Sequence, residues 1–445
     1  MMTPTVLPVP ALEPAPEVIL PYVSEQILPN GLQVLSVHRP GVPLVEMRLR
    51  IPFGSLEPRH AARAVLLAET LLAGTASRDR IELAERLQEL GTALSVAVDA
   101  DQLLVSGAVL VDHLHELLVL LGDVLVEARY PDHEVAADRS RLLQRLKVSR
   151  SRAPVLARET LQYHLYGAHP YGSLLPAPDE LATVTAQDLR LLHEQRVAAR
   201  GSALILVGDL TAERAGEISA DALDGWRRES AAEELIPEVP PIMPDPSLLV
   251  HRPGSVQSSI RIGGPALRRD DRRYPALQLA NLLYGGYFCS RLVANIREEK
   301  GFTYSPRSHI DHGRAGATLV VEADVATGVT APALLEMWYE LGRLSTFQPT
   351  DQELEDVRQY ASGSLAMSIA TQSGLAGTLT ELTGVGLDLN WIRTHPQLIA
   401  AVTVEDMYDI GVHILAPCRL AVVVIGDATQ IAEPLKAFGP WQVRT

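Results

Sequence analysis

The sequence has only two cysteines, Cys289 and Cys418, among its 445 residues. So few thiols exclude a disulfide framework and a cysteine-rich zinc site, and they fit a reducing compartment. Long apolar runs are also missing, since none reaches the roughly 18–20 residues that a membrane span needs. Residues 1–22 are rich in proline and lack the basic start and apolar core of a signal peptide. We therefore expect a disordered N-terminus and a cytoplasmic protein.

Basic residues are outnumbered, with 39 Lys and Arg against 54 Asp and Glu, which gives a net charge of −15. This balance argues against a nucleic-acid-binding surface. The glycine pairs Gly263-Gly264 and Gly285-Gly286 match neither a phosphate-binding loop nor a dinucleotide fingerprint, and no Gly-x-Ser-x-Gly occurs. The usual signatures of nucleotide-dependent enzymes and serine hydrolases are therefore absent.

What the sequence does contain is an internal repeat. Val-His-Arg-Pro-Gly stands at Val37–Gly41 and again at Val250–Gly254, which are 250 − 37 = 213 positions apart. Val-Gly-Asp at Val207–Asp209 is echoed by Ile-Gly-Asp at Ile425–Asp427, at an offset of 425 − 207 = 218. Offsets that drift by only a few residues indicate a duplicated domain with small insertions in its loops.

The length and the apolar fraction of 47% are sufficient for two domains of about 200 residues each. Alternating strands such as 43–51 and apolar helical stretches such as 61–73 recur in a similar order in both halves. The expected fold class is α+β, with two homologous domains that each form a mostly antiparallel sheet with helices on one face. The domains are placed at 23–223 and 247–445. Residues 224–246 are acidic and proline-rich, which predicts a semi-rigid linker.

Three further features belong to a known pattern. A strand begins after Asn30-Gly31, a buried helix ends in Leu71–Thr75 (Leu-Leu-Ala-Gly-Thr), and His169–Gly172 reads His-Pro-Tyr-Gly. Together with the duplication, they resemble the pitrilysin (insulinase-like) metallopeptidases, in the size class of the mitochondrial processing peptidase. The resemblance covers roughly residues 20–435, and it implies that family's two-domain α+β fold.

The resemblance also locates a zinc site. The family's motif is His-x-x-Glu-His, in which two histidines one helical turn apart hold the metal and the glutamate is the general base. Here the matching positions carry Val65, Ala68 and Glu69, and the family's third ligand falls around Gln144-Arg145. Both histidines and the base are missing, so we expect neither zinc nor another cofactor in this chain.

A second family signature is retained. Arg297-Glu298-Glu299-Lys300-Gly301-Phe302-Thr303-Tyr304 resembles the motif whose arginine and tyrosine, seven apart, grip the substrate and stabilise the tetrahedral intermediate. The resemblance thus assigns catalytic roles to Arg297 and Tyr304. The simpler alternative is an ion pair between Arg297 and Glu298 or Glu299, with Tyr304 in the core.

A glycine-rich loop just before this signature also resembles a part of the family's site, the loop that flanks the substrate. It predicts substrate-binding roles for Gly285, Gly286, Tyr287 and Phe288. A plain turn at a helix end is the alternative, and the sequence leaves both open.

These observations favour a non-metal subunit of a heterodimeric zinc peptidase. A homologous partner with His-x-x-Glu-His would supply the zinc, and this chain would supply Arg297 and Tyr304 to cleave an unstructured peptide, without nucleic acid or membrane. The alternative is a catalytically inert scaffold or peptide-binding member of the family. A third reading, a homodimeric peptidase with an unforeseen metal site, also remains open, and the sequence does not identify the substrate, the partner or the pathway.

Overall fold

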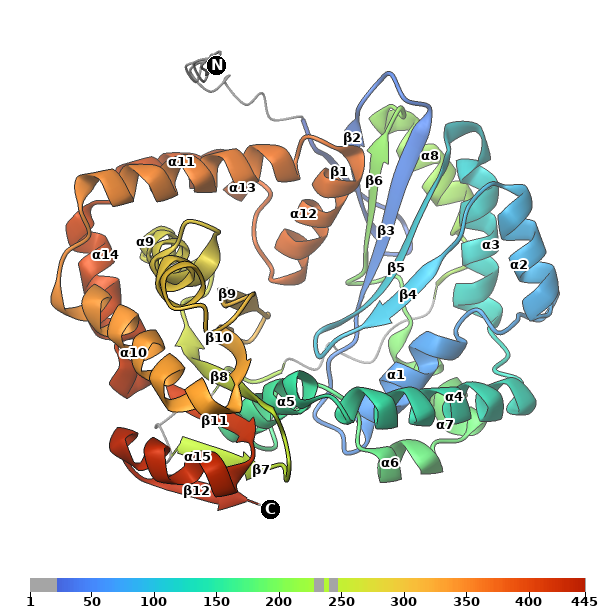
Figure 1. Cartoon of the computed structure of the whole chain (residues 1–445). Helices are drawn as coiled ribbons and strands as arrows, with labels where there is room; N and C mark the ends of the chain where they lie inside the picture. Colours follow the sequence, from blue (N-terminus) through green and yellow to red (C-terminus); the bar gives the residue numbers. More distant parts are fainter. Residues whose placement is uncertain (1–21, 228–235, 240–246, 445) are drawn as a thin grey trace, which may run out of the picture.

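The chain folds around two six-stranded sheets (Figure 1). The computed structural model describes residues 22–227, 236–239 and 247–444. The first sheet has the order β1-β2-β6-β3-β5-β4 and the second β12-β7-β11-β8-β10-β9. The strands are β1 Ser24–Ile27, β2 Gln33–His38, β3 Leu44–Pro52, β4 Ser95–Val98, β5 Gln102–Leu110, β6 Ala203–Gly208, β7 Ser247–His251, β8 Gln257–Ala266, β9 Arg307–His312, β10 Ala317–Ala326, β11 Ala421–Gly426 and β12 Trp441–Arg444.

The two sheets share one topology, which confirms the α+β fold class with two homologous, mostly antiparallel sheets. In the first half β2 runs parallel to β6, and β3 pairs antiparallel with β6 and β5. In the second half β7 runs parallel to β11, and β8 pairs antiparallel with β11 and β10. Only one edge differs, because β1 is antiparallel to β2 whereas β12 is parallel to β7.

The helices also follow the same order in both halves. Those of the first half are α1 His60–Thr70, α2 Arg80–Glu89, α3 Leu114–Glu127, α4 Asp132–Arg150, α5 Ala153–Tyr166, α6 Pro178–Thr183, α7 Ala186–Arg196 and α8 Ala212–Ala222. Those of the second are α9 Tyr274–Asn281, α10 Thr330–Thr346, α11 Asp351–Ser368, α12 Gln372–Gly384, α13 Trp391–Ala401, α14 Val404–Ile410 and α15 Ala428–Leu435. Two π-helical segments, η3 Leu282–Gly286 and η4 Val293–Glu299, follow α9.

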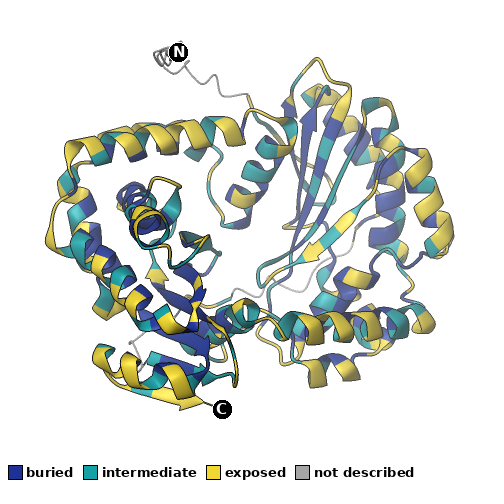
Figure 2. Cartoon of the chain, in the orientation of Figure 1, coloured by how far each residue is buried: buried dark blue, intermediate teal, exposed yellow. Residues whose placement is uncertain are grey.

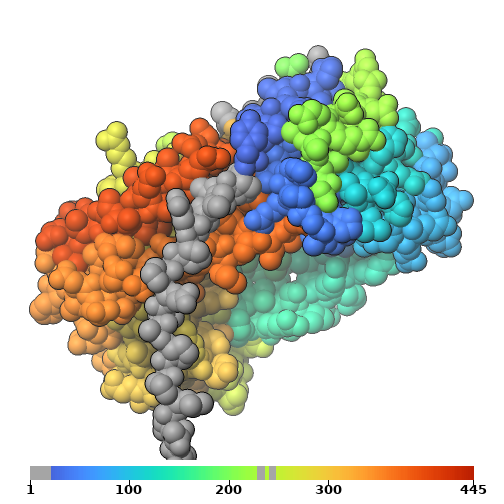
Figure 3. Space-filling view, turned by 90° about the horizontal axis from the view of Figure 1, so that it is seen from above, coloured from blue at the N-terminus to red at the C-terminus, as the bar shows by residue number. Residues whose placement is uncertain are grey.

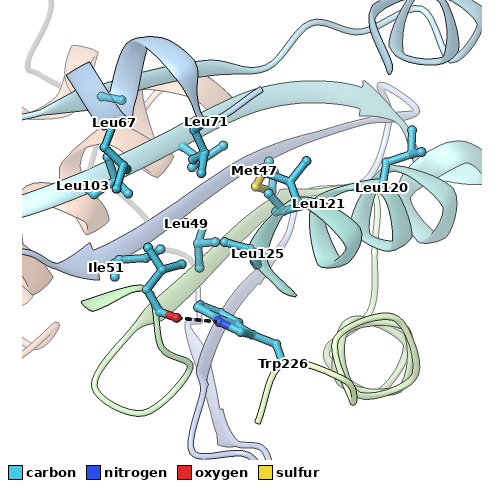
Figure 4. Packing of buried hydrophobic residues seen from close by; sticks show 14 of the residues in the cluster. Met47, Leu49, Ile51, Leu67, Leu71, Leu103, Leu120, Leu121, Leu125 and Trp226 are labelled. Carbon is cyan, nitrogen blue, oxygen red and sulfur yellow. Dashed lines mark hydrogen bonds between the residues drawn. The ribbon is translucent and has the colours of Figure 1, made fainter. Parts of the chain in front are cut away.

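Each half buries an apolar core between one face of its sheet and its own helices (Figure 2). In the first half the alternating residues Met47, Leu49 and Ile51 of β3 point into this core. Trp226 closes it, and its indole N–H donates to the carbonyl of Val197 at 3.2 Å (Figure 4). The period-two pattern of β3 therefore sets the face that the helices cover.

The opposite face of each sheet is covered by a helix from the other half, which the sequence did not predict. Helix α5 packs through Leu161 and Leu165 on β8 and β11 of the second sheet. Helix α12, its counterpart in the repeat, packs through Leu375 and Leu379 on the first sheet, against β3 and β6 (Figure 1). Each half thus completes the core of the other.

The repeated Val-His-Arg-Pro-Gly segments anchor these exchanged helices. Arg39 donates to the carbonyls of Ile369 and Ala370, at 3.1 and 2.7 Å, in the connection between α11 and α12. Arg252 donates to the carbonyl of Ser151 at 2.7 Å, in the equivalent connection between α4 and α5. Figure 3 shows orange residues of the second half against blue residues of the first. The repeat therefore carries an inter-half contact as well as a strand end.

The linker lies partly within the described residues. In its described part, 236–239, the N–H of Val239 donates to the carbonyl of Ala315, and the carbonyl of Pro237 lies 3.0 Å from His169 Nε2. Of residues 1–22, which are expected to be disordered, 1–21 lie outside the described residues. The exact domain boundaries stay a prediction. Within the described ranges, no helix combines the length and the apolar character needed to cross a bilayer.

Candidate functional site

The positions of the expected zinc motif lie on α1, where it packs against α4. Val65 is half-buried and Ala68 is buried, and both are apolar. Glu69 forms an ion pair with Arg145 of α4, with 2.6 Å between Oε2 and Nη2. Since Arg145 is one of the two residues expected at the third ligand position, a guanidinium lies among the positions where the family holds its metal. In the described ranges 22–227, 236–239 and 247–444, no group of three or more His, Cys, Asp or Glu side chains could hold a metal ion.

Arg297 lies at the end of η4, between two aromatic rings. Its guanidinium carbon is 4.8 Å from the ring centroid of Phe288 and 4.6 Å from that of Tyr304. Its Nε pairs with Glu298 Oε1 at 3.1 Å. The aromatic faces attract the cation and fix the plane of the fork. The structure thus brings together Arg297, Tyr304 and Phe288, three of the residues selected from the sequence.

The seven-residue spacing of Arg297 and Tyr304 has a local cause. Gly301 adopts a positive φ of 64°, a left-handed conformation in which glycine carries no steric penalty. Its N–H donates to the carbonyl of Arg297 at 3.1 Å, and the N–H of Phe302 donates to that of Ile296 at 2.8 Å. This helix-ending turn reverses the chain and returns Tyr304 to Arg297. Tyr304 is 79% exposed, so it does not belong to the core.

The Arg297–Tyr304 pair borders a cleft of about 740 Å³. The end of β10 forms the facing wall of this cleft, which the sequence did not indicate. The lining residues are Gln257, Arg297, Glu298, Gly301, Phe302, Thr303, Tyr304, Ser305, Asp324 and Ala326. Two carboxylates, one guanidinium and several backbone groups give the cleft a polar interior. Tyr304 adds exposed aromatic surface to it, whereas Phe288, 63% exposed, contacts Arg297 without lining the cleft.

The predicted substrate loop divides into an inner and an outer part. Gly285 is buried, and a side chain there would press against Ser308 and Leu292. Gly286 lies against Asn281, and the ring of Tyr287 packs on Tyr360 of α11 at 5.0 Å.

Only Phe288 of this loop contacts Arg297, while none of the four lines the cleft itself. The substrate-binding role of the loop stays a prediction.

Helix α11 holds the segment between this loop and η4 in place. Arg291 donates through Nε and Nη2 to the two carboxylate oxygens of Glu353, both at 2.8 Å. Burial alone would raise the pKa of Glu353, but the hydrogen bonds from Arg291 and Thr350 outweigh it and hold the pKa at about 2. This planar double contact fixes the chain just after the predicted substrate loop of residues 285–288.

His169–Gly172, by contrast, lies in a contact between the halves. The Tyr171 hydroxyl donates to both carboxylate oxygens of Asp101, at 3.0 and 2.8 Å, and accepts from the N–H of Ala315 at 2.9 Å. Burial and the charge of Asp101 raise the pKa of Tyr171, so its proton stays in place as the donor. The N–H of Arg314 also donates to Asp101. The His-Pro-Tyr-Gly motif thus joins the β4–β5 turn to the β9–β10 turn.

The structure therefore has two duplicated α+β halves, with the Glu69–Arg145 ion pair at the expected zinc positions of the first and the Arg297–Tyr304 pair beside a cleft in the second. Residues 33–179 match the model of the insulinase family (peptidase family M16), and residues 183–360 match that of the peptidase M16 inactive domain. These matches extend over both halves, and the chain belongs to the M16 peptidase family. The resemblance drawn from the sequence is confirmed.

Relatives and solved structures agree with this membership. An uncharacterised zinc protease of Mycobacterium leprae is 24% identical over 91% of this chain and 92% of its own length. A protein of Helicobacter pylori described as a non-peptidase homologue is 23% identical over 80% and 82%. The crystal structure of a peptidase M16 inactive domain from Pseudomonas fluorescens superimposes with a TM-score of 0.83 at 23% identity, covering 91% of this chain and 98% of that one.

Proposed function

We propose that this chain is the non-metal subunit of a heterodimeric zinc peptidase in the cytoplasm. A homologous partner with His-x-x-Glu-His supplies the zinc, and this chain supplies Arg297 and Tyr304. The substrate is an unstructured peptide that lies between the two subunits. The contrast between the two halves carries the proposal. At the zinc positions Glu69 pairs with Arg145, whereas the Arg–Tyr pair borders an open cleft.

The chemistry of Arg297 suits a site that another chain completes. Its Nη atoms have no hydrogen-bond partner within the described part of the chain, because the ion pair to Glu298 uses Nε. A guanidinium fork and a phenol that lie about 3 Å from a developing oxyanion stabilise it strongly where water is excluded. The partner's zinc would polarise the peptide bond and activate the attacking water, while Arg297 and Tyr304 hold the substrate carbonyl.

The test is reconstitution with a homologous chain that carries His-x-x-Glu-His. The mixture is expected to cleave an unstructured peptide, and removal of zinc with a chelator is expected to stop cleavage. Arg297→Ala should then remove about 2–4 kcal/mol of transition-state stabilisation and so lower kcat, without loss of assembly. Arg268→Ala is the matched control, since Arg268 pairs with Asp270 on the surface. Normal turnover by Arg297→Ala would overturn the assignment.

A second candidate is an inert member of the family that binds peptides without cleaving them. The Helicobacter pylori relative described as a non-peptidase homologue favours it. In that case the chain binds peptide alone, and no homologous zinc chain converts binding into cleavage. Metal analysis of the purified chain also bears on the homodimeric alternative, which requires about one zinc per chain.

A further inference from the structure

The segment that carries Arg297, η4, is a π-helix rather than an α-helix. Its closing hydrogen bond runs from the N–H of Lys300 to the carbonyl of Asn295 at 3.0 Å, across five residues. In an α-helix, which turns about 100° per residue, side chains five apart would project about 140° from each other. The wider π turn instead brings Asn295 and Lys300 toward one face of the segment, which packs against α10.

Glu336 of α10 binds both of these side chains. Its Oε2 accepts a hydrogen bond from Asn295 Nδ2 at 3.0 Å, and its Oε1 lies 3.4 Å from Lys300 Nζ. Asn295 Nδ2 also donates to Glu340 Oε1 at 2.9 Å. The contacts are shielded from water, since Asn295 is buried and the Glu336 side chain is only 22% exposed. One carboxylate of α10 therefore spans the π turn, from two residues before Arg297 to three residues after it.

The π turn also determines where the chain reverses after Arg297. Arg297 lines the cleft, whereas Asn295 and Lys300 are not among the lining residues. If the turn closed as an α-helix, the N–H of Glu299 would bond to the carbonyl of Asn295, one residue earlier than Lys300 does. The chain that follows would then rotate by about 100°, and Tyr304 would leave the guanidinium of Arg297. The contact between Arg297 and Tyr304 thus depends on the one extra residue in this turn.

We propose that Glu336 is a positioning residue for the Arg297–Tyr304 pair. It contacts neither the substrate nor the reacting atoms, and it acts by holding Asn295 and Lys300 in the π turn. Isolated π turns are rare, so the segment needs contacts of this kind to keep the wider turn. The proposal rests on the proposed function and deepens it, because it names the group that keeps Arg297 and Tyr304 together before a partner binds.

The first measurement uses this chain alone. Glu336→Ala should accelerate hydrogen exchange at the Lys300 amide, which closes the π turn, and should shift the NMR signal of the Arg297 Nε–H. Glu336→Gln should change both less, because its side-chain oxygen still accepts an amide hydrogen bond. Glu405→Gln is the matched control, since Glu405 is exposed on α14, which also packs against α10. If Glu336→Ala changes neither the exchange nor the Nε–H signal, the proposal is wrong.

A charge exchange separates positioning from a simple loss of stability. Glu336→Lys places two ammonium groups side by side and should disturb the Arg297 Nε–H most. Addition of Lys300→Glu restores an ion pair across the turn. Asn295 Oδ1, which is buried and has no hydrogen-bond partner within the described part of the chain, can accept from the new ammonium. The double variant should therefore recover the original signal. A folded double variant without this recovery overturns the proposal, even if Glu336→Ala misfolds.

The kinetic test distinguishes this proposal from the proposed function. In the reconstituted peptidase, Glu336→Ala should lower kcat about ten-fold, because a small displacement of a group that acts in the transition state is costly. In an Arg297→Ala background, the same substitution should have no further effect, since it acts through Arg297. Additive effects would contradict positioning and leave the subunit assignment intact. If the exchange and NMR results hold but no homologous zinc chain produces cleavage, the positioning role stands and the assignment fails.

Discussion

Arg145 Nη2 lies 2.6 Å from Glu69 Oε2, so α4 presents a positive charge to the helix on which the zinc motif was expected. The side chains of Arg145 and Glu69 are 58% and 34% exposed, and such a pair contributes only about 0–1 kcal/mol to stability. The pair matters more for metal binding than for the stability of the fold. A guanidinium offers no lone pair to a metal and repels a divalent cation.

This relationship predicts how zinc binding could be restored. The triple variant Val65→His, Ala68→Glu, Glu69→His should bind zinc weakly, because Arg145 stays beside the site. Addition of Arg145→Glu should tighten binding by at least about ten-fold, since a carboxylate replaces a repelling charge. Zinc titration and metal analysis after dialysis measure both. Equal affinity of the triple and quadruple variants would contradict the role of Arg145.

Phe288 offers a test of how Arg297 is held. Loss of an exposed cation–π contact costs about 0.5–1 kcal/mol, so Phe288→Leu should lower kcat/KM of the reconstituted complex roughly two- to five-fold. Phe288→Tyr keeps the aromatic face and should retain the activity. A readout that does not need the partner is the NMR signal of the Arg297 Nε–H, which should broaden or shift in Phe288→Leu alone. The idea fails if both variants behave as the unaltered protein.

Leu161 connects the two halves, since it belongs to α5 of the first and is buried against the sheet of the second. Leu161→Ala should destabilise the protein by about 2–5 kcal/mol through loss of apolar contact and an added cavity. Hydrogen exchange should accelerate in β8 and β11 rather than in β2 and β6. Tyr163→Ala on the same helix is the control, because Tyr163 is exposed and its loss should cost less than about 0.5 kcal/mol. If hydrogen exchange accelerated only in the first sheet, the packing of α5 on the second sheet would be contradicted.

The sequence predicted those features that a single continuous segment determines. The motif positions Val65, Ala68 and Glu69 lie on a single helix, and Arg297 and Tyr304 are joined by one helix-ending turn. Periodicity likewise predicts which face of β3 is buried. In each case the residues that decide the structure are neighbours along the chain, so local pattern was sufficient.

Contacts between distant segments could not be predicted in this way. The apolar face of α5 shows that Leu161 is buried, but it does not show that the covering sheet belongs to the other half. Tyr171 was recognised only as a motif residue, because its partners Asp101 and Ala315 lie 70 or more positions away.

Acid should weaken the ion pair between Arg291 and Glu353, which fixes the chain just after the predicted substrate loop of residues 285–288. The pKa of Glu353 is about 2 in the folded chain and near its usual 4.5 when unfolded, so the carboxylate stabilises the fold above that usual value. Its contribution, about 2 kcal/mol after allowance for solvent, should be lost as the pH falls from about 4.5 toward 2. Glu353→Gln should therefore lower stability at neutral pH and flatten the decline in acid. Urea denaturation across this range measures both, with Asp356→Asn on the same helix as the control. If the free energy of unfolding of Glu353→Gln falls with acid as steeply as that of the unaltered protein, the charge of Glu353 does not contribute to stability through Arg291.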